Sequence, residues 1–202
     1  MDHVGVFATI VARTPTPGRP VLVAVDGVDG SGKTTFAAHL AAAYEGRPVV
    51  VVHEDDFLNP RHVRYRRGRD SPEGFFLDTY DLPALIANVL DPLSREGQGR
   101  ITPAVFDHRA DATVPPAPVD VPSDGVVIVE GMFLHRDELA GRWDLSVFLD
   151  VPFRETARRM ALRDGSEPDP EHPSLRRYVE GQRIYLARCH PHERATFVID
   201  NT

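Results

Sequence analysis

Residues 27–34, G-V-D-G-S-G-K-T, constrain the fold of this chain more than any other part of its sequence. They match the pattern G-x-x-x-x-G-K-[ST], whose glycines let a loop wrap its backbone N–H groups around phosphate oxygens. Such a loop follows a buried strand and opens a helix. Both neighbours are present, because the apolar run 21–26 precedes the motif and apolar residues recur at helical spacing in 33–44. The sequence therefore predicts a strand, a phosphate-binding loop (P-loop) and a helix, in that order.

The residue types in the P-loop predict a nucleotide site that also uses a metal ion. The N-terminus of the following helix adds partial positive charge. The pattern assigns Lys33 to the β- and γ-phosphates and the Thr34 hydroxyl to Mg²⁺. The predicted nucleotide-binding residues are Gly27, Asp29, Gly30, Ser31, Gly32, Lys33, Thr34 and Thr35.

Lys33 also stands out against the composition of the chain. Of the 23 basic residues, 22 are arginine and only Lys33 is lysine. A genome rich in G and C explains the preference for arginine, but it leaves this one lysine unexplained. A planar guanidinium does not easily replace a compact ammonium group where a point charge must fit. Lys33 is therefore a predicted catalytic residue.

The rest of the chain alternates between strand and helix patterns. Further apolar runs of strand length lie at 49–52, 126–129, 145–149 and 196–199. Helices are expected at 4–13, 81–93, 135–140, 153–164 and 174–188. Apolar strands that alternate with helices form parallel sheets covered on both faces. The sequence predicts the α/β class, with a three-layer α/β/α P-loop NTPase fold, a parallel core of about five strands and a single domain over 1–202.

Three segments fall outside this alternation. Residues 59–74 are polar and arginine-rich, residues 101–123 are rich in proline, and residues 164–175 are rich in turn formers. We expect the first two to be excursions at the edge of the sheet that bind the acceptor, which is the molecule that receives a phosphoryl group. We expect the third to be a lid, because ligand-binding loops lie in such places. A solvated loop without function is the alternative for the arginine cluster at 61–69.

Acidic residues follow two of the predicted strands. Asp55 and Asp56 come shortly after the run 49–52, and Glu130 follows 126–129. In a doubly wound sheet, ligands bind at the carboxyl ends of the strands. A carboxylate after the second strand can accept a proton from a hydroxyl or hold Mg²⁺ through water, and Glu130 occupies the position of a Walker-B carboxylate. The alternative for the two aspartates is a solvated strand end.

Composition and motifs argue against several other classes. A GTPase would carry N-K-x-D, which needs a lysine beyond the P-loop, so ATP is the expected nucleotide. The net charge of −7 counts against non-specific binding to nucleic acid or to an anionic membrane. Residues 1–13 lack the basic start of a signal peptide, and no apolar run is long enough to span a membrane. The single cysteine suits a reducing compartment, so a cytoplasmic protein is expected.

Several pieces of sequence together resemble one family of P-loop kinases: G-V-D-G-S-G-K-T-T, E-D-D-F, P-A-V-F-D, V-I-V-E-G, and F-L-D followed by an arginine-rich helix. Across 21–200 the chain is similar to the uridine kinase-like family, with its pantothenate kinase and phosphoribulokinase relatives. The resemblance implies ATP-dependent phosphoryl transfer to a hydroxyl of a small molecule, with Mg²⁺ held by Thr34, Glu130 and Asp55. It also implies that Asp55 is the catalytic base and that Arg163, in A-L-R-D, is a lid arginine that closes over the transferring phosphate.

The residues expected to hold the acceptor depart from the family's pattern. Phe106 replaces the tyrosine of P-V-Y-D, and His108 comes earlier than the family's base-binding histidine. The resemblance also implies that Arg159 is a second lid arginine near the substrate, and a solvated helix face is the alternative for this residue. The stretch F-F-L-D-T-Y-D replaces F-D-H-P, so Asp78 and Asp81 compete as substrate residues. Asp81 can also serve as a helix cap.

The identity of the acceptor is therefore open among several small molecules. The 5′-hydroxyl of a pyrimidine nucleoside, uridine or cytidine, is the first candidate. Pantothenate, a sugar or a specialised metabolite are alternatives, and a nucleotide-binding regulatory protein without turnover is a rival from another class. Neither nucleic acid nor a membrane is an expected partner, and a homo-oligomer is left open.

Overall fold

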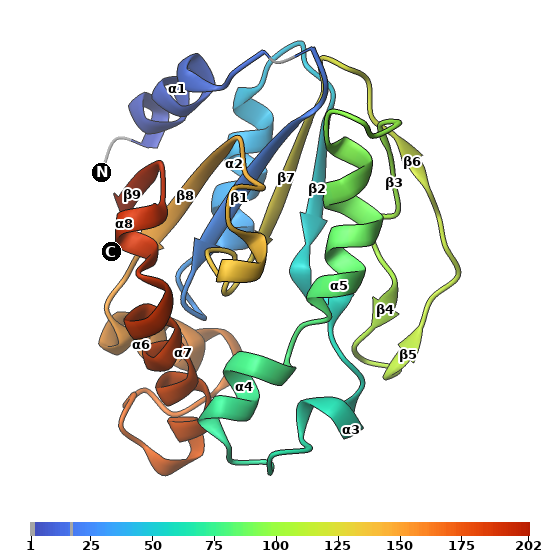
Figure 1. Ribbon diagram of the computed structural model, residues 1–202. Coiled ribbons are helices and arrows are strands. Elements are labelled where there is room, and N and C mark those ends of the chain that lie inside the picture. The colour runs from blue at the N-terminus through green and yellow to red at the C-terminus, as the bar shows by residue number, and fades with distance from the viewer. Residues whose placement is uncertain (1–2, 17) are drawn as a thin grey trace.

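Figure 1 shows the computed structural model, which describes residues 3–16 and 18–202. Within these residues a five-stranded sheet forms the core, with strand order β2-β7-β1-β8-β9 and every neighbouring pair parallel. The strands are β1 (Val21–Gly27), β2 (Val49–His53), β7 (Val126–Gly131), β8 (Leu145–Asp150) and β9 (Phe197–Asp200). The predicted three-layer α/β/α fold around a parallel sheet of about five strands is confirmed.

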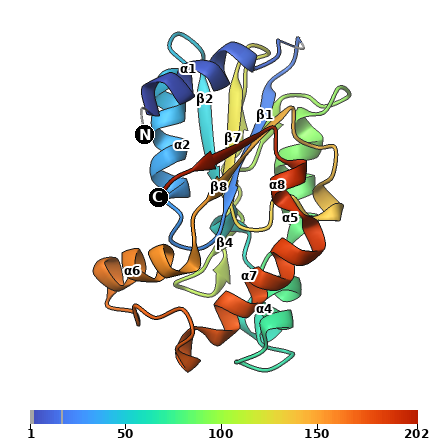
Figure 2. The same cartoon turned by 90° about the vertical axis from the view of Figure 1, so that its left-hand side faces the viewer.

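One face of the sheet is covered by α1 (His3–Arg13) and α2 (Lys33–Ala43), as Figure 2 shows. Phe36 and Leu40 of α2 are buried in the same core as Val23. β1 and β7 are buried along their whole length, which explains the uninterrupted apolar character of their sequences.

The other face is covered by α4 (Pro72–Asp78), α5 (Leu82–Leu85) and α7 (Arg176–Cys189). Phe75 of α4 and Tyr185 of α7 are buried in the core on this side. Among the described residues, no helix combines the length and the apolar character that a crossing of a bilayer requires.

The helix expected at 81–93 is present but irregular. The Asp81 carboxylate caps it by accepting a hydrogen bond from the Ala84 amide (3.0 Å). Beyond α5 the chain continues as a π-helical turn, Ile86–Leu90, and a 3₁₀ turn, Asp91–Leu93. The other expected helices and strands lie within a few residues of their predicted bounds, with one exception.

The prediction of a helix at 135–140 is wrong, because this segment forms only a 3₁₀ turn, Asp137–Leu139. His135 and Arg136 are both buried. Nδ1 of His135 hydrogen-bonds the Asp26 carboxyl group (2.6 Å), and Arg136 donates to the Phe76 carbonyl (2.7 Å). These inward contacts hold the backbone of Arg136 extended (ψ 155°), so a helix cannot start before Asp137.

Residues 101–123 form short antiparallel ribbons outside the central sheet (Figure 1). β3 (Arg100–Ile101) pairs with β6 (Val119–Asp120), and β4 (Phe106–Asp107) pairs with β5 (Ala112–Thr113). The Val105 amide donates to the Asp56 carbonyl (3.1 Å), which attaches the β4–β5 ribbon to the segment after β2.

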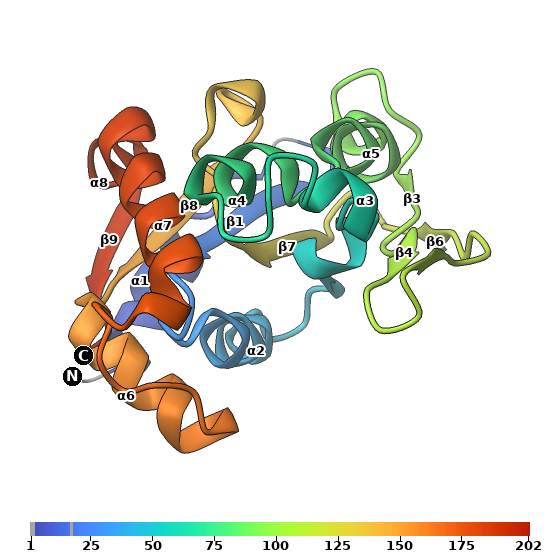
Figure 3. The same cartoon turned by 90° about the horizontal axis from the view of Figure 1, so that it is seen from below.

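The carboxyl ends of β1, β2 and β7 meet at one edge of the sheet. Figure 3 views the molecule from below, with α3 (Arg61–Arg64), α4, α6 (Phe153–Asp164) and α7 surrounding this edge. The register pairs His53 with Glu130. The P-loop after β1 and the 3₁₀ turn Glu54–Phe57 after β2 therefore begin beside Glu130.

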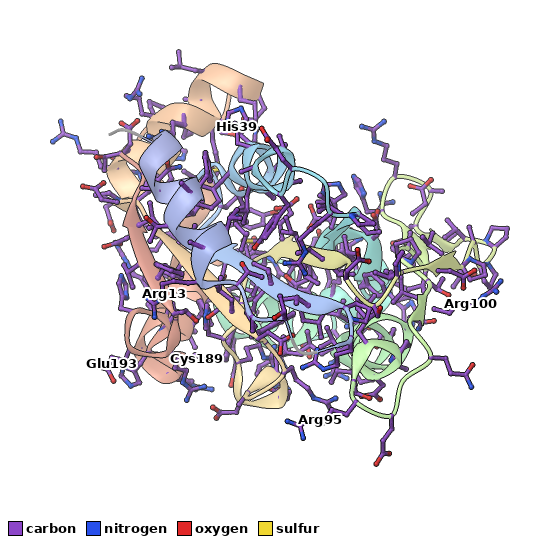
Figure 4. All side chains as sticks on the ribbon, turned by 90° about the horizontal axis from the view of Figure 1, so that it is seen from above. Arg13, His39, Arg95, Arg100, Cys189 and Glu193 are labelled. Carbon is purple, nitrogen blue, oxygen red and sulfur yellow. The ribbon has the colours of Figure 1, made fainter. Side chains whose placement is uncertain are left out.

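Cys189 is buried at the end of α7 (Figure 4), and burial raises the pKa of its thiol. A thiol that stays protonated is a poor nucleophile. Cys189 is therefore a core residue of the α7 face.

Leu40→Ala should lower the free energy of unfolding by about 2–5 kcal/mol, because it opens a cavity beneath α2. Leu40 is fully buried, whereas Leu162 on α6 is 76% exposed. Leu162→Ala is the matched control and should change the free energy of unfolding by no more than about 0.5 kcal/mol. Urea denaturation measures both values, and equal losses would contradict the packing of α2 on the sheet.

Candidate active site

A cavity of about 450 Å³ opens at the carboxyl edge between the P-loop, the turn after β2 and α6. Most of the predicted site residues line it: Asp29, Gly30, Gly32, Lys33, Thr34, Thr35, Asp55, Glu130, Arg159 and Arg163. The lining also includes four residues that the sequence analysis does not single out: Tyr80, Gly131, Met132 and Met160. Gly131 follows Glu130 in V-E-G and could have been found from that motif, whereas no local pattern marks Tyr80.

The P-loop backbone requires glycine at Gly30. Its φ of +74° is left-handed, and a Cβ there would lie 2.9 Å from the Thr156 carbonyl oxygen of α6. Gly27 ends β1, and the buried Ser31 lies outside the cavity lining. These two residues therefore do not face the cavity, whereas Asp29, Gly30 and the residues from Gly32 to Thr35 line it.

Lys33 and Thr34 sit at the start of α2. The Lys33 ammonium donates to the Val28 carbonyl (3.0 Å), and the Thr34 hydroxyl donates to Oε1 of Glu130 (3.1 Å). A hydroxyl and a carboxylate in contact at a cavity wall are the hard oxygen ligands that Mg²⁺ prefers. Thr34 and Glu130, with Asp55 on the same cavity, therefore fit a magnesium ion.

His53 is a neighbour of Glu130 that no motif predicts. Its Nδ1 lies 2.6 Å from Oε1 of Glu130, the oxygen that also accepts from Thr34. This hydrogen bond raises the pKa of the His53 imidazole, while partial burial opposes the rise. His53 therefore helps to orient Glu130 by holding one of its two carboxylate oxygens.

Asp55 and Asp56 have different surroundings although they are adjacent. Asp55 lines the cavity, and its Oδ1 accepts a hydrogen bond from the Tyr80 hydroxyl (3.1 Å). Asp56 does not line the cavity, and partial burial raises the pKa of its carboxyl group. Of the two, only Asp55 is placed to meet a ligand beside the P-loop.

Glu54 is fully buried directly beneath the cavity wall. Among the described residues, neither of its carboxyl oxygens has a hydrogen-bond partner. Burial and the nearby Asp26 and Asp55 raise its pKa well above the ordinary range. A Cβ on Gly131 would lie within 2.4 Å of two Glu54 atoms, so only glycine fits after Glu130.

A hydrogen-bond network around Asp26 supports the P-loop from below. The Asp26 carboxyl group has no solvent exposure and accepts from the Gly27 amide (2.7 Å), from Nδ1 of His135 and from the Tyr185 hydroxyl. Burial and the charge of Asp26 raise the pKa of Tyr185 well above its usual range, which keeps its hydroxyl a donor. The network joins β1 to the segment after β7 and to α7.

The C-terminal part of the chain also contacts the P-loop. Oε1 of Gln182, on α7, accepts from the Asp29 amide (2.6 Å), and the Asn201 side chain donates to the Ser31 carbonyl (2.7 Å). Arg159 in turn donates to the Asn201 carbonyl (2.8 Å). The P-loop is therefore held on both sides by residues far away in the sequence.

Asp78 lies away from the cavity. It is buried and accepts from Arg66 (2.5 Å) and Arg67 (2.9 Å). In the same cluster at 61–69, Arg64 pairs with Asp111 at 3.3 Å. These arginines are thus engaged with acidic residues of the protein itself.

Two other residues predicted to hold substrate do not line the cavity. Phe106 is buried in β4, and His108 is exposed in the turn of the β4–β5 ribbon. Asp81, the competitor of Asp78, is occupied as the cap of α5.

Arg159 and Arg163 reach the cavity from α6. Arg159 is paired with Glu155 (2.8 Å), while the partner of Arg163 is Asp164, its neighbour in sequence (2.8 Å). α6 ends at Asp164, and Gly165 turns the chain with a φ of +76°. Arg163 therefore stands at the point where the helix gives way to the segment 164–175.

Together, the parallel sheet, the P-loop and the carboxylates at its edge define a protein of the P-loop NTPase fold class. Comparison with known proteins narrows this class. Residues 22–167 match the model of the phosphoribulokinase/uridine kinase family. The chain belongs to this family and is therefore a phosphotransferase.

Individual relatives agree with this assignment. The chain is 31% identical to a uridine kinase of Deinococcus deserti, over 90% of this chain and 87% of that protein. It is similar in structure to a possible uridine kinase from Bacillus stearothermophilus (TM-score 0.76, 25% identity, 99% and 100% of the two chains). It is equally similar to a candidate fructose transport system kinase from Silicibacter sp. TM1040 (TM-score 0.76, 26% identity, 98% and 99%).

The His53–Glu130 pair predicts a pH-dependent stability. The folded-state pKa of His53 is raised above its ordinary value of 6.5. The stabilisation from the pair is therefore complete below pH 6.5 and is lost as the pH rises through the raised pKa. In nucleotide-free protein with EDTA, His53→Asn should lower Tm at about pH 6 and have little effect at about pH 9. Thermal denaturation across this range measures the difference, and a difference that grows with pH would contradict the prediction.

Proposed function

We propose that the protein transfers the γ-phosphoryl group of ATP to a hydroxyl of a small molecule. One observation carries the proposal: Lys33 and Thr34 of the P-loop line a single cavity with Asp55. A phosphate-binding loop and a proton-accepting carboxylate therefore share one space. A protein that only bound nucleotide would not need a base beside the phosphates, so this arrangement favours a kinase over a regulatory protein.

In the proposed reaction, the P-loop amides and the Lys33 ammonium hold the phosphates of ATP at the start of α2. Thr34 and Glu130 would hold Mg²⁺ directly and Asp55 would do so through water, and the bound ion would offset the negative charge of the phosphates. Asp55 orients the acceptor hydroxyl and accepts its proton. Arg159 and Arg163 neutralise charge on the transferring group, and the segment 164–175 closes over it as a lid. Positioning and charge neutralisation supply most of the catalysis, because the transition state is loose.

A second cavity, of about 620 Å³, offers room for the base of the nucleotide. It adjoins the first, because Gly32 and Thr35 line both. Phe36 and His39 of α2 and Phe7 of α1 supply aromatic rings on its wall. Phe7 and Phe36 are buried and pack on each other, so they form an apolar wall, while the exposed His39 ring can stack on a planar base whose phosphates reach the P-loop. We propose that this cavity is the binding site for the adenine base of ATP.

For the acceptor, the 5′-hydroxyl of uridine or cytidine is the first candidate, supported by the uridine kinases among the relatives. A sugar is the second, supported by the structural similarity to the candidate fructose transport system kinase. The excursions 59–74 and 101–123 border the carboxyl edge and are proposed to complete the acceptor site. The use of ATP is consistent with a cytoplasmic enzyme.

ADP release measured with uridine, cytidine, pantothenate and fructose tests the proposal directly. We expect Mg²⁺-dependent ADP release that increases with at least one of these acceptors and stops in EDTA. If no acceptor raises ADP release above the background, a nucleotide-binding regulatory protein without turnover becomes the preferred function.

Asp55→Asn should lower kcat by roughly 10²–10⁴-fold, the usual contribution of a general base, and leave the affinity for ATP nearly unchanged. Asp56→Asn is the matched control, because Asp56 carries the same charge but lies outside the cavity. Steady-state kinetics and calorimetry with ATP measure the two effects. A larger loss in the Asp56 variant would reverse the roles of the two residues.

Lys33→Arg should lower kcat by about 10²–10³-fold, the cost of removing one electrostatic donor from the transition state. The planar guanidinium cannot occupy the place of the ammonium group beside the Val28 carbonyl. Lys33→Ala sets the scale for a complete loss. Nearly normal turnover in the arginine variant would show that the site requires only a positive charge.

A further inference from the structure

Tyr80 is a buried residue of the cavity wall that the proposed reaction has not used. Its side chain is 5% exposed, and its ring packs edge-on against Phe133 with 6.1 Å between the ring centroids. A phenylalanine ring would fill the same space. The hydroxyl is therefore the part of Tyr80 that packing leaves unexplained.

The backbone fixes Tyr80 beside the turn that carries Asp55. Tyr80 forms an antiparallel bridge with Leu58. The bridge is flanked by hydrogen bonds from the Asn59 amide to the Thr79 carbonyl (2.9 Å) and from the Asp81 amide to the Phe57 carbonyl (2.8 Å). The position of the Tyr80 ring relative to Asp55 is thus set by the main chain.

The arginine cluster adds a second anchor to this segment. Asp78, two residues before Tyr80, is buried and held by Arg66 and Arg67. The Asn59 side chain also donates to the Asp78 carbonyl (3.2 Å). Asp78 and its arginines therefore hold in place the segment that presents Tyr80.

The Tyr80 hydroxyl donates to Oδ1 of Asp55 at 3.1 Å. No other donor among the described residues is bonded to the Asp55 carboxylate. One oxygen of Asp55 is thereby engaged, and Oδ2 is left for the acceptor.

We propose that Tyr80 is a positioning residue, whose hydroxyl fixes the rotation of the Asp55 carboxylate so that Oδ2 faces the hydroxyl of the acceptor. The inference rests on the proposed function, in which Asp55 orients that hydroxyl and accepts its proton. Tyr80 acts through Asp55 and does not itself touch the acceptor. A carboxylate free to rotate would orient the acceptor less often, which slows transfer without weakening binding.

Tyr80→Phe tests this, because it keeps the ring and removes only the hydroxyl. We expect kcat to fall about 10-fold to 100-fold, with KM for the acceptor, the affinity for ATP and Tm nearly unchanged. The acceptor is whichever of uridine, cytidine, pantothenate and fructose the wild type phosphorylates fastest. Tyr44→Phe is the matched control, because Tyr44 is equally buried and shares a hydrogen bond with Thr14 (2.6 Å) away from the cavity.

A double-mutant cycle separates positioning from a merely structural role. In the Asp55→Asn background, adding Tyr80→Phe should cost little further, because the group that Tyr80 orients is already gone. Additive losses would overturn the proposal, as would an unchanged kcat in Tyr80→Phe or a rise in KM for the acceptor without a fall in kcat. A wild type inactive on all four acceptors would instead remove the proposed function on which the inference depends.

Discussion

The buried carboxyl group of Asp26 is the contact on which the geometry of the site depends. A polar group with no access to water is tolerated only where hydrogen-bond donors surround it. Here the donors come from Gly27, His135 and Tyr185, which belong to the start of the P-loop, the segment after β7 and α7. Satisfying this one group therefore determines where the P-loop leaves the sheet. The place of Lys33 and Thr34 relative to Glu130 follows from it.

The sequence was sufficient for those parts of the molecule that local pattern controls. The P-loop between its strand and helix, and the parallel sheet, could be predicted because burial on both faces imposes uninterrupted apolar runs. The grouping of Asp55 and Glu130 followed because the carboxyl ends of parallel strands share an edge. The contacts of Tyr80 with Asp55 and of His53 with Glu130 could not be predicted. Each contact joins two segments that are far apart in the sequence, and local hydrophobic patterns carry no information about such pairs. The partners of Asp78 could not be predicted either. Arg66 and Arg67 lie in the segment 59–74, which was itself predicted to bind the acceptor, so nothing in the sequence indicated that they would bond to Asp78.

The residues that contact the P-loop extend beyond the part of the chain that matches the family model. The family model covers residues 22–167, which include the P-loop, Asp55, Glu130, Arg159 and Arg163. Gln182 and Asn201 lie beyond this range, yet they bond directly to the P-loop at Asp29 and Ser31. The phosphate-binding element is thus shared with the family, while part of its support comes from residues outside the matched region.

The strand order has a consequence for how the protein is made. β1 lies at the centre of the sheet between β7 and β8, and Val21 pairs with Val126. A ribosome delivers β1 long before either neighbour, so the P-loop strand must wait unpaired while about half of the chain is synthesised. Long-range pairing of this kind slows folding and exposes apolar strands meanwhile. We expect chaperone contact with the nascent chain to be concentrated in the interval between the emergence of β1 and that of β7.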